Sequence, residues 1–114
     1  MSNALRKTGF AAFGVLVAMT SVTAIAAPTA AEVAKAKGCM ECHALDKEVW
    51  GPSLKQVAKY YRPLSTGKAL VAQKILKGSA EHWGERSMPA HATGPVSVSN
   101  AEAEQIAAWV LTLK

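Results

Sequence analysis

Cysteine is scarce in this chain, and several patterns that mark common classes of protein are missing. Only two cysteines occur in 114 residues. They are too few for a structural zinc site built on thiolates, which would need further ligands. No run of Lys or Arg indicates nucleic-acid binding. No phosphate-binding loop, paired-carboxylate motif or arrangement of Ser, His and Asp indicates catalysis by those groups. The sequence also has no alternating strand pattern, internal repeat or low-complexity tract, which favours a small helical protein.

The two cysteines belong to a single motif, Cys39-Met40-Glu41-Cys42-His43, which has the C-x-x-C-H spacing of a covalent haem c site. Two thiols at this spacing can each form a thioether with one vinyl group of the same haem, and the following imidazole then reaches the iron. We therefore predict that Cys39 and Cys42 hold one haem c and that His43 binds its iron. The alternative is a thiol–disulfide motif of the thioredoxin kind, which would leave His43 without a role.

Residues 1–26 have the features of a secretory signal peptide. Arg6 and Lys7 give the positively charged start, and an apolar run follows from Phe10 to Met19. This run is short compared with the about 20 residues that a membrane-spanning helix needs. We therefore expect a cleaved signal and no stable membrane span, with an uncleaved membrane anchor as the alternative.

The small residues Ala24-Ile25-Ala26 place cleavage after Ala26, so that residues 27–114 form one domain. This domain keeps eleven Lys and Arg against eight Asp and Glu, a net charge of +3 that suits an acidic partner protein. Export carries both cysteines into an oxidising compartment, and we expect the periplasm. A domain this small often needs a cofactor or a cross-link for stability, which a covalent haem would supply.

Helix signals and apolar spacing predict an all-α fold of about four short helices wrapped around one covalent haem. Two capping boxes, Thr29 with Glu32 and Ser99 with Glu102, mark the first and last helices. The long loop of residues 78–98 is rich in Gly, Ser and Pro, and a cofactor would give it something to surround. The predicted helices run from Thr29 to Lys37, from Pro52 or Ser53 to Pro63, from Ser65 or Thr66 to Lys77, and from Ser99 to about Leu113. Their buried faces would contain Leu54, Val57, Ala58 and Tyr61, then Val71 and Ile75, and finally Ile106, Trp109, Val110 and Leu113.

The sixth position of the iron determines whether the haem can bind small molecules or only transfer electrons. Met40, His82, Met88 and His91 are the candidates, but Met40 is tethered on the side of the first axial ligand. We predict Met88, because it lies in the long loop and residues 27–114 contain no other free methionine. A thioether ligand favours reduced iron and would raise the potential. His91 is the main alternative ligand and would lower the potential. Otherwise His82 and His91 are expected to be surface histidines.

Taken together, these residues resemble the class I monohaem cytochromes c of bacteria, most closely the cytochrome c-551 (cytochrome c8) group. The resemblance covers nearly the whole of residues 27–114. It is carried by Lys37-Gly-Cys-Met-Glu-Cys-His-Ala-Leu-Asp46, Trp50-Gly-Pro52, Ile75-Leu-Lys-Gly-Ser79, Trp83-Gly84, Ser87-Met-Pro89 and Ala107-Ala-Trp-Val-Leu111.

The resemblance implies roles for the matching positions. Pro52 matches the proline whose carbonyl accepts the ring N–H of the histidine ligand, which would fix the tautomer of that ligand. Trp83 matches the tryptophan whose indole N–H points to a haem propionate, and Lys74 matches a basic neighbour of a propionate. Gly38 and Trp109 match a close contact between the first and last helices, where a side chain at Gly38 would obstruct the approach.

The chain departs from the family pattern in the long loop. Met88-Pro-Ala-His91 stands where the family usually has Met-Pro-Pro-Asn, whose asparagine donates to the methionine sulfur. His91 would either donate in the same way or be free. The stretch from His91 to Ser99 is also longer than is usual in the family.

We therefore expect a periplasmic one-electron carrier with one haem c, ligated by His43 and Met88, and no enzymatic activity. It would shuttle electrons between a respiratory donor and a terminal reductase, oxidase or peroxidase. Its partners would be redox proteins and not nucleic acid, with docking near Lys47, Lys55 and Lys59, and we expect a monomer. The alternative is a five-coordinate haem sensor or peroxidase-like enzyme, which requires that Met88 does not bind the iron.

Overall fold

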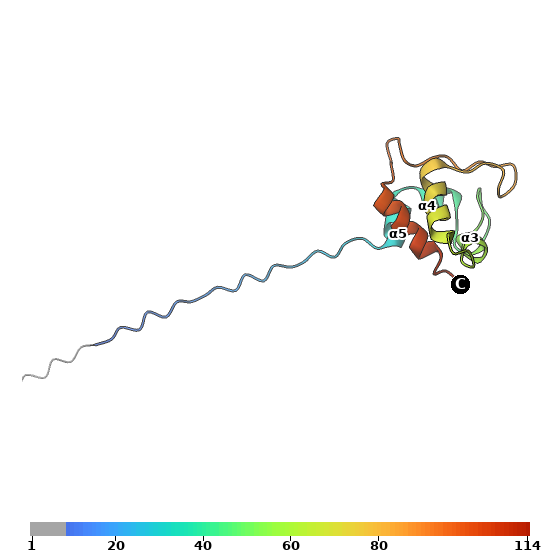
Figure 1. The fold of residues 1–114 in the computed structure, drawn as a ribbon. Helices are drawn as coiled ribbons and strands as arrows, with labels where there is room; N and C mark the ends of the chain where they lie inside the picture. The colour runs from blue at the N-terminus through green and yellow to red at the C-terminus, as the bar shows by residue number, and fades with distance from the viewer. Residues whose placement is uncertain (1–8) are drawn as a thin grey trace, which may run out of the picture.

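A computed structural model of the chain describes residues 9–114 (Figure 1). Residues 9–28 contain no helix and run away from the domain as an exposed, extended segment. The apolar run from Phe10 to Met19 falls in this segment, whereas Arg6 and Lys7 lie outside the described residues, so the secretory signal stays a prediction. Within residues 9–114, no helix combines the length and the apolar character that crossing a membrane requires.

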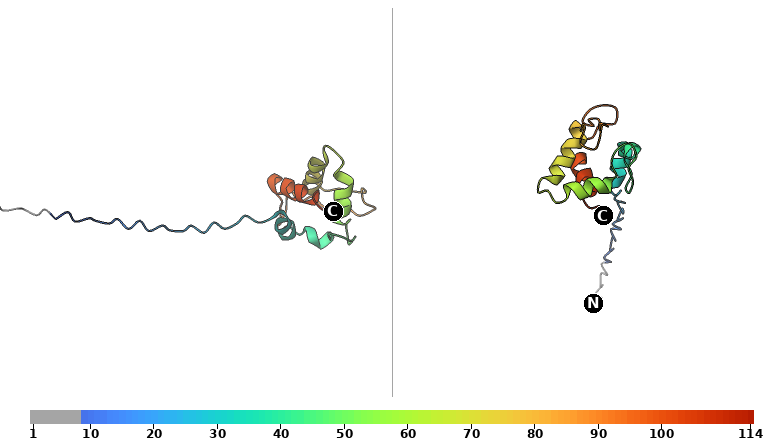
Figure 2. Two further views of the ribbon diagram at one scale, coloured as in Figure 1. Left: turned by 90° about the horizontal axis from the view of Figure 1, so that it is seen from below. Right: turned by 90° about the vertical axis from the view of Figure 1, so that its right-hand side faces the viewer.

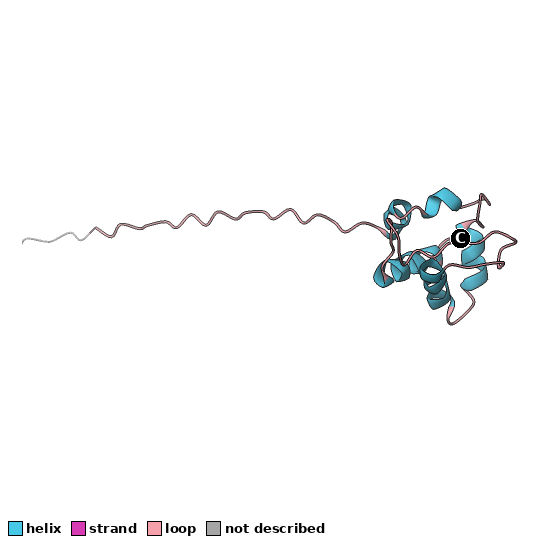
Figure 3. Cartoon of the chain, turned by 90° about the horizontal axis from the view of Figure 1, so that it is seen from above, coloured by secondary structure: helices cyan, strands magenta, loops and turns pink. Residues whose placement is uncertain are grey.

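Five helices form in the described part of the chain, joined by loops (Figure 3). They are α1 (Ala30–Ala36), α2 (Cys39–Cys42), α3 (Leu54–Tyr61), α4 (Gly67–Lys77) and α5 (Asn100–Val110). Residues 9–114 contain no strand, only an isolated bridge between Ser79 and Met88, so the predicted all-α fold is confirmed. The helix that was not predicted is α2, a single turn made by the cysteine motif itself.

Side-chain capping positions the start of three helices. In each, a hydroxyl accepts from a backbone N–H three residues on, and the side chain at that position bonds back to the capping residue, which satisfies two otherwise unpaired N–H groups. The pairs are Thr29 with Glu32 in α1, Ser53 with Gln56 in α3, and Ser99 with Glu102 in α5. The first and third pairs confirm the prediction, and the second decides that α3 is capped by Ser53 and not by Pro52.

The turn between α1 and α2 depends on Gly38, for a reason other than the one that the sequence predicted. Gly38 has a φ of 79°, in the left-handed region that only glycine adopts without cost. A Cβ added there would meet nothing nearer than the Glu41 side chain at 3.8 Å. The expected obstruction of Trp109 was therefore wrong, and backbone conformation is what favours glycine.

The core lies where α5 packs against α4 and α1, with α3 closing the domain against α4 and α5 (Figure 2). The predicted apolar faces point inward: Leu54, Ala58 and Tyr61 of α3 are buried, while Val57 is half-buried. In α5, Trp109 is also only half-buried. The buried apolar residues form one cluster of Val33, Ala34, Leu54, Ala58, Tyr61, Val71, Ala72, Ile75, Val98, Ala103, Ile106, Ala107 and Val110.

Candidate haem-binding site

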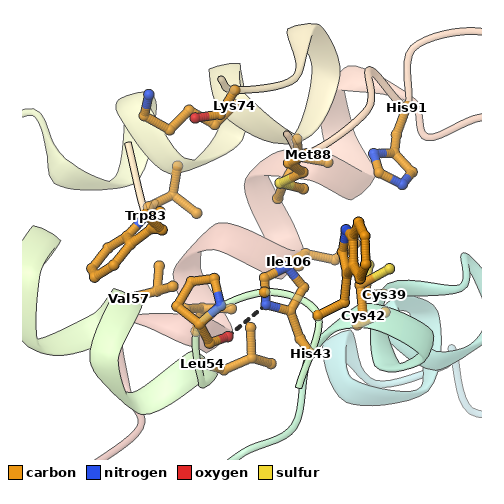
Figure 4. A pocket seen from close by; sticks show the side chains of 18 of the residues that line it. Cys39, Cys42, His43, Leu54, Val57, Lys74, Trp83, Met88, His91 and Ile106 are labelled. Carbon is orange, nitrogen blue, oxygen red and sulfur yellow. Dashed lines mark hydrogen bonds between the residues drawn. The ribbon is translucent and has the colours of Figure 1, made fainter. Parts of the chain in front are cut away.

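All five helices contribute to the wall of one cavity (Figure 4). Its empty volume is about 1110 Å³, which includes the open solvent at its mouth. Apolar side chains of α3, α4 and α5, such as Val57, Val71 and Ile106, form much of its wall. Every residue that the sequence proposed for cofactor binding lines this cavity, namely Cys39, Cys42, His43, Pro52, Lys74, Trp83 and Met88.

The two thiols reach the cavity because α2 is helical. Residues three apart lie on the same face of a helix, so a single turn turns Cys39 and Cys42 to the same side. Both cysteines are half-buried and not joined to each other, and burial raises the pKa of the Cys39 thiol. The two cysteines therefore lie next to each other at one wall of the cavity (Figure 4), as attachment to a single flat group requires.

The imidazole of His43 is held in one orientation by the loop that follows it. His43 ends α2 in an extended conformation, and its Nδ1 lies 2.7 Å from the carbonyl oxygen of Pro52. Because a carbonyl can only accept, this contact requires the proton on Nδ1, which leaves the lone pair of Nε2 available for a metal. The geometry therefore provides the tautomer that an iron ligand needs.

Gly51 is a site residue whose role the sequence analysis missed. A Cβ added to Gly51 would lie 2.8 Å from Cε1 of His43, which is closer than real Cβ atoms approach other atoms. It would also lie 3.1 Å from Nδ1, which is tighter than most Cβ contacts. The loop backbone can therefore pass against the imidazole only because this residue has no side chain. Its signal in the sequence was its position directly before Pro52.

Met88 lies on the side of the cavity away from His43, next to α4 (Figure 4). Two backbone hydrogen bonds fix its place, from Ser79 N to Met88 O at 2.9 Å and from Met88 N to Ser79 O at 2.7 Å. Ser79 comes after Gly78, the C-cap of α4, so the bridge attaches the long loop close to the end of that helix. The thioether is half-buried among the cavity walls and the imidazole stands opposite.

The two other histidines differ from each other. His82 is exposed, as predicted, and its Nε2 lies 3.2 Å from the hydroxyl of Tyr61. His91 is not a surface histidine: it lines the cavity, and its Nδ1 is buried with no protein partner. Its backbone is held by bonds from its N–H to Ile75 and from Val98 to its carbonyl. A polar atom in such a place normally has a partner, so His91 is the lining residue whose hydrogen bonding the protein itself leaves incomplete.

The donors that line the cavity fit a covalent haem c. Thiols at α2 can form the thioether links, and one imidazole and one thioether are a known pair of axial ligands for haem iron. The apolar walls suit the faces of a porphyrin, while Lys74 and Trp83 bring N–H donors to the same cavity. Nothing in the described lining conflicts with this group.

Comparison with known proteins agrees with the geometry. The family model described as cytochrome c matches residues 28–114. The chain is 42% identical over 86 residues to cytochrome c-551 of Azotobacter vinelandii, covering 75% of this chain and 99% of that protein. It is 41% identical over 83 residues to cytochrome c-552 of Hydrogenobacter thermophilus, covering 73% and 80%. The crystal structure of wild-type Nitrosomonas europaea cytochrome c552 superposes with a TM-score of 0.67 at 39% identity, covering 74% of this chain and 99% of that one. The chain therefore belongs to the cytochrome c family, as a class I monohaem c-type cytochrome close to the cytochrome c-551 group.

Proposed function

We propose that this protein carries single electrons on one haem c, which is attached through Cys39 and Cys42 and ligated by His43 and Met88. The observation that carries the proposal is the arrangement of His43 and Met88 on opposite sides of a cavity that both thiols also line. The group itself supplies an iron centre that gains and loses one electron. The names of the relatives, cytochromes c-551 and c-552, support the same conclusion.

The protein's part in this function is to hold both ligands still. Pro52 fixes the His43 ring, and the bridge to Ser79 fixes the backbone of Met88. Ligands that keep their place in both oxidation states keep reorganisation small, which favours fast electron transfer. With both axial positions filled, no position remains for a substrate or gas, so we propose a carrier and not an enzyme.

Three neighbours would orient the bound group. The Pro52 carbonyl orients the His43 ring by accepting from its Nδ1, which leaves Nε2 directed at the iron site. Lys74, half-buried on α4, and the indole N–H of Trp83 are donors in the cavity wall that would bond the propionates. These contacts would set how deeply the ring sits and hence how polar its surroundings are.

We further propose that residues 1–26 are a signal peptide and that residues 27–114 function in the periplasm as a monomer. The partners would be a respiratory donor and a terminal reductase, oxidase or peroxidase with acidic docking surfaces, in keeping with the net charge of +3 of residues 27–114. Of the three candidate docking lysines, Lys55 already forms an ion pair with Asp46. Lys47 and Lys59 are exposed and therefore better candidates.

Two measurements on the full chain, expressed with export and haem attachment, test the proposal. Mass spectrometry is expected to show loss of residues 1–26 and addition of one haem that remains in denaturant. Replacing Met88 with Ala is expected to abolish the charge-transfer band that an iron–thioether bond gives ferric haem. Met40→Ala is the matched control, because Met40 lies between the thiols and packs on the core.

A ferric spectrum that does not change in Met88→Ala would contradict Met88 as ligand and point to His91. A high-spin spectrum in the unaltered protein would instead indicate an open sixth position and a sensor or peroxidase-like function. A haem that leaves the chain in denaturant would contradict the whole proposal.

A further inference from the structure

We propose that Arg86 is a positioning residue that keeps the Met88 loop closed over the cavity, by clamping it to the loop that carries Trp50. The inference rests on the proposed function, because it assumes that Met88 is an axial ligand. Arg86 lies two residues before Met88, and both line the cavity together with Trp50. No motif in the sequence marked Arg86 or its contact with Trp50.

The contact has three components. Arg86 Nη1 donates to the carbonyl oxygen of Val49 at 2.9 Å and to that of Trp50 at 3.0 Å. The guanidinium carbon also lies 4.6 Å from the centroid of the Trp50 ring, within the range of a cation–π contact. A flat guanidinium can stack on an aromatic face and donate in its own plane at the same time, which lysine cannot do.

The position of this clamp gives it a function. Met88 is joined by its bridge to Ser79, and the residues after it are held to α4 by bonds from His91 to Ile75 and from Ala92 to Leu76, so the segment before the bridge is the part that these bonds leave unattached. On the other side of the cavity mouth, the loop of residues 44–52 holds Pro52, which orients His43. Among residues 9–114, the two bonds of Arg86 are the hydrogen bonds that join the segment 80–87 to residues 44–52.

The exposure of the partners shows that the clamp is at the surface and not in the core. Trp50 is 54% exposed and Val49 is 47% exposed, while Arg86 is itself exposed. Loss of the clamp would therefore open the loop locally and leave the packed helices intact. An open segment 80–87 uncovers the cavity and loosens the backbone just before Met88, so an outside ligand can displace the thioether more readily, which gives a direct readout.

Imidazole binding to the ferric protein measures this opening, because imidazole must displace Met88 to bind. Its apparent affinity rises with the population of the open loop. We expect Arg86→Ala to bind imidazole about 5- to 30-fold more tightly than the unaltered protein, the range that corresponds to loss of a modest contact. The thioether charge-transfer band is expected to remain in Arg86→Ala without imidazole, since the closed state still predominates.

Arg62→Ala is a matched control. Arg62 is also exposed and also donates to two backbone carbonyls, those of Leu111 and Leu113, but it lies outside the cavity lining. We expect Arg62→Ala to lower global stability while its imidazole affinity stays within about twofold of the unaltered protein. Equal effects of the two substitutions on imidazole binding would overturn the inference, because they would show that only global stability matters.

An imidazole affinity of Arg86→Ala within about twofold of the unaltered protein would also overturn it. Should Arg86→Ala not mature with haem, Arg86→Lys decides: it keeps the charge but not the planar fork, and we expect about threefold tighter binding or more. Unchanged affinity in Arg86→Lys refutes the clamp. Failure of the proposed function is recognised separately, since the unaltered ferric protein would then lack the thioether band.

Discussion

Replacing Gly51 with Ala tests whether the loop backbone holds the His43 ring in place. The added methyl carbon would lie 2.8 Å from Cε1 and 3.1 Å from Nδ1 of His43. Carbon atoms in contact prefer a separation of about 3.5–4.0 Å, so the ring or the loop must move by up to about 1 Å. The ring has little freedom to move, because its Nδ1 is bonded to Pro52 at 2.7 Å.

The cost can be worked from these contacts. Overpacking by one methyl group costs about 1–3 kcal/mol, and loss of the bond between His43 and Pro52 would add about 0.5–1.5 kcal/mol. We expect Gly51→Ala to lower the free energy of unfolding by about 2–4 kcal/mol, which combines these two ranges without assuming that the full bond is lost. Weaker donation from a tilted imidazole should also change the ring-proton shifts of His43 in the NMR spectrum.

Guanidinium unfolding followed by circular dichroism gives the stability, and NMR of the reduced protein reports the ring. Gly84→Ala is the control, because Gly84 has a φ of 98° and nothing lies within 4 Å of its Cβ position. That control is expected to cost about 1 kcal/mol of backbone strain and to leave His43 unchanged. A Gly51→Ala protein with unchanged stability and unchanged His43 shifts would refute this account of the loop.

Two further predictions concern the ends of α5. Arg62→Ala should lower the free energy of unfolding by about 1 kcal/mol in guanidinium, because it removes bonds to the carbonyls of Leu111 and Leu113 at an exposed site; an unchanged midpoint would count against it. Backbone donation from Ser99, and then the bond to Lys37, lower the pKa of Glu102. The contribution of Glu102 to the free energy of unfolding is therefore complete above the ordinary Glu pKa of about 4.3. It is lost as the pH falls through the lower pKa that Glu102 has in the folded protein. Glu102→Gln should lose less stability than the unaltered protein on acidification below about pH 4.3, and identical pH profiles would refute this.

Local signals predicted the start of helices better than their end. Thr29 with Glu32 and Ser99 with Glu102 act within one turn, so the sequence contains all that the cap needs. The end of α5 is different: the helix stops at Val110, although apolar spacing extended it to about Leu113. There the side chain of Arg62, from a distant segment, donates a hydrogen bond to the carbonyl of Leu111. No pattern within α5 could predict that contact.

The site residues also fall into those that a local pattern predicts and those that depend on distant contacts. The spacing of Cys39, Cys42 and His43 is local, and one turn of helix is enough to bring the thiols together. The part played by Arg86 was not predicted, because it depends on loops that are 36 residues apart in sequence. The burial of His91 was likewise missed, since whether a loop histidine faces a cavity depends on how that loop packs on α4.

By itself, the sequence determined the helices other than α2, the haem-attachment motif and the family resemblance, because capping, apolar periodicity and C-x-x-C-H spacing act over a few residues. Only the tertiary structure decided that Met88 lies across a cavity from His43, that Gly51 leaves room for the imidazole, and that Arg86 joins two loops at the cavity mouth. These contacts join segments far apart in the chain. Their energies arise only when packing brings the segments together, so no local pattern encodes them.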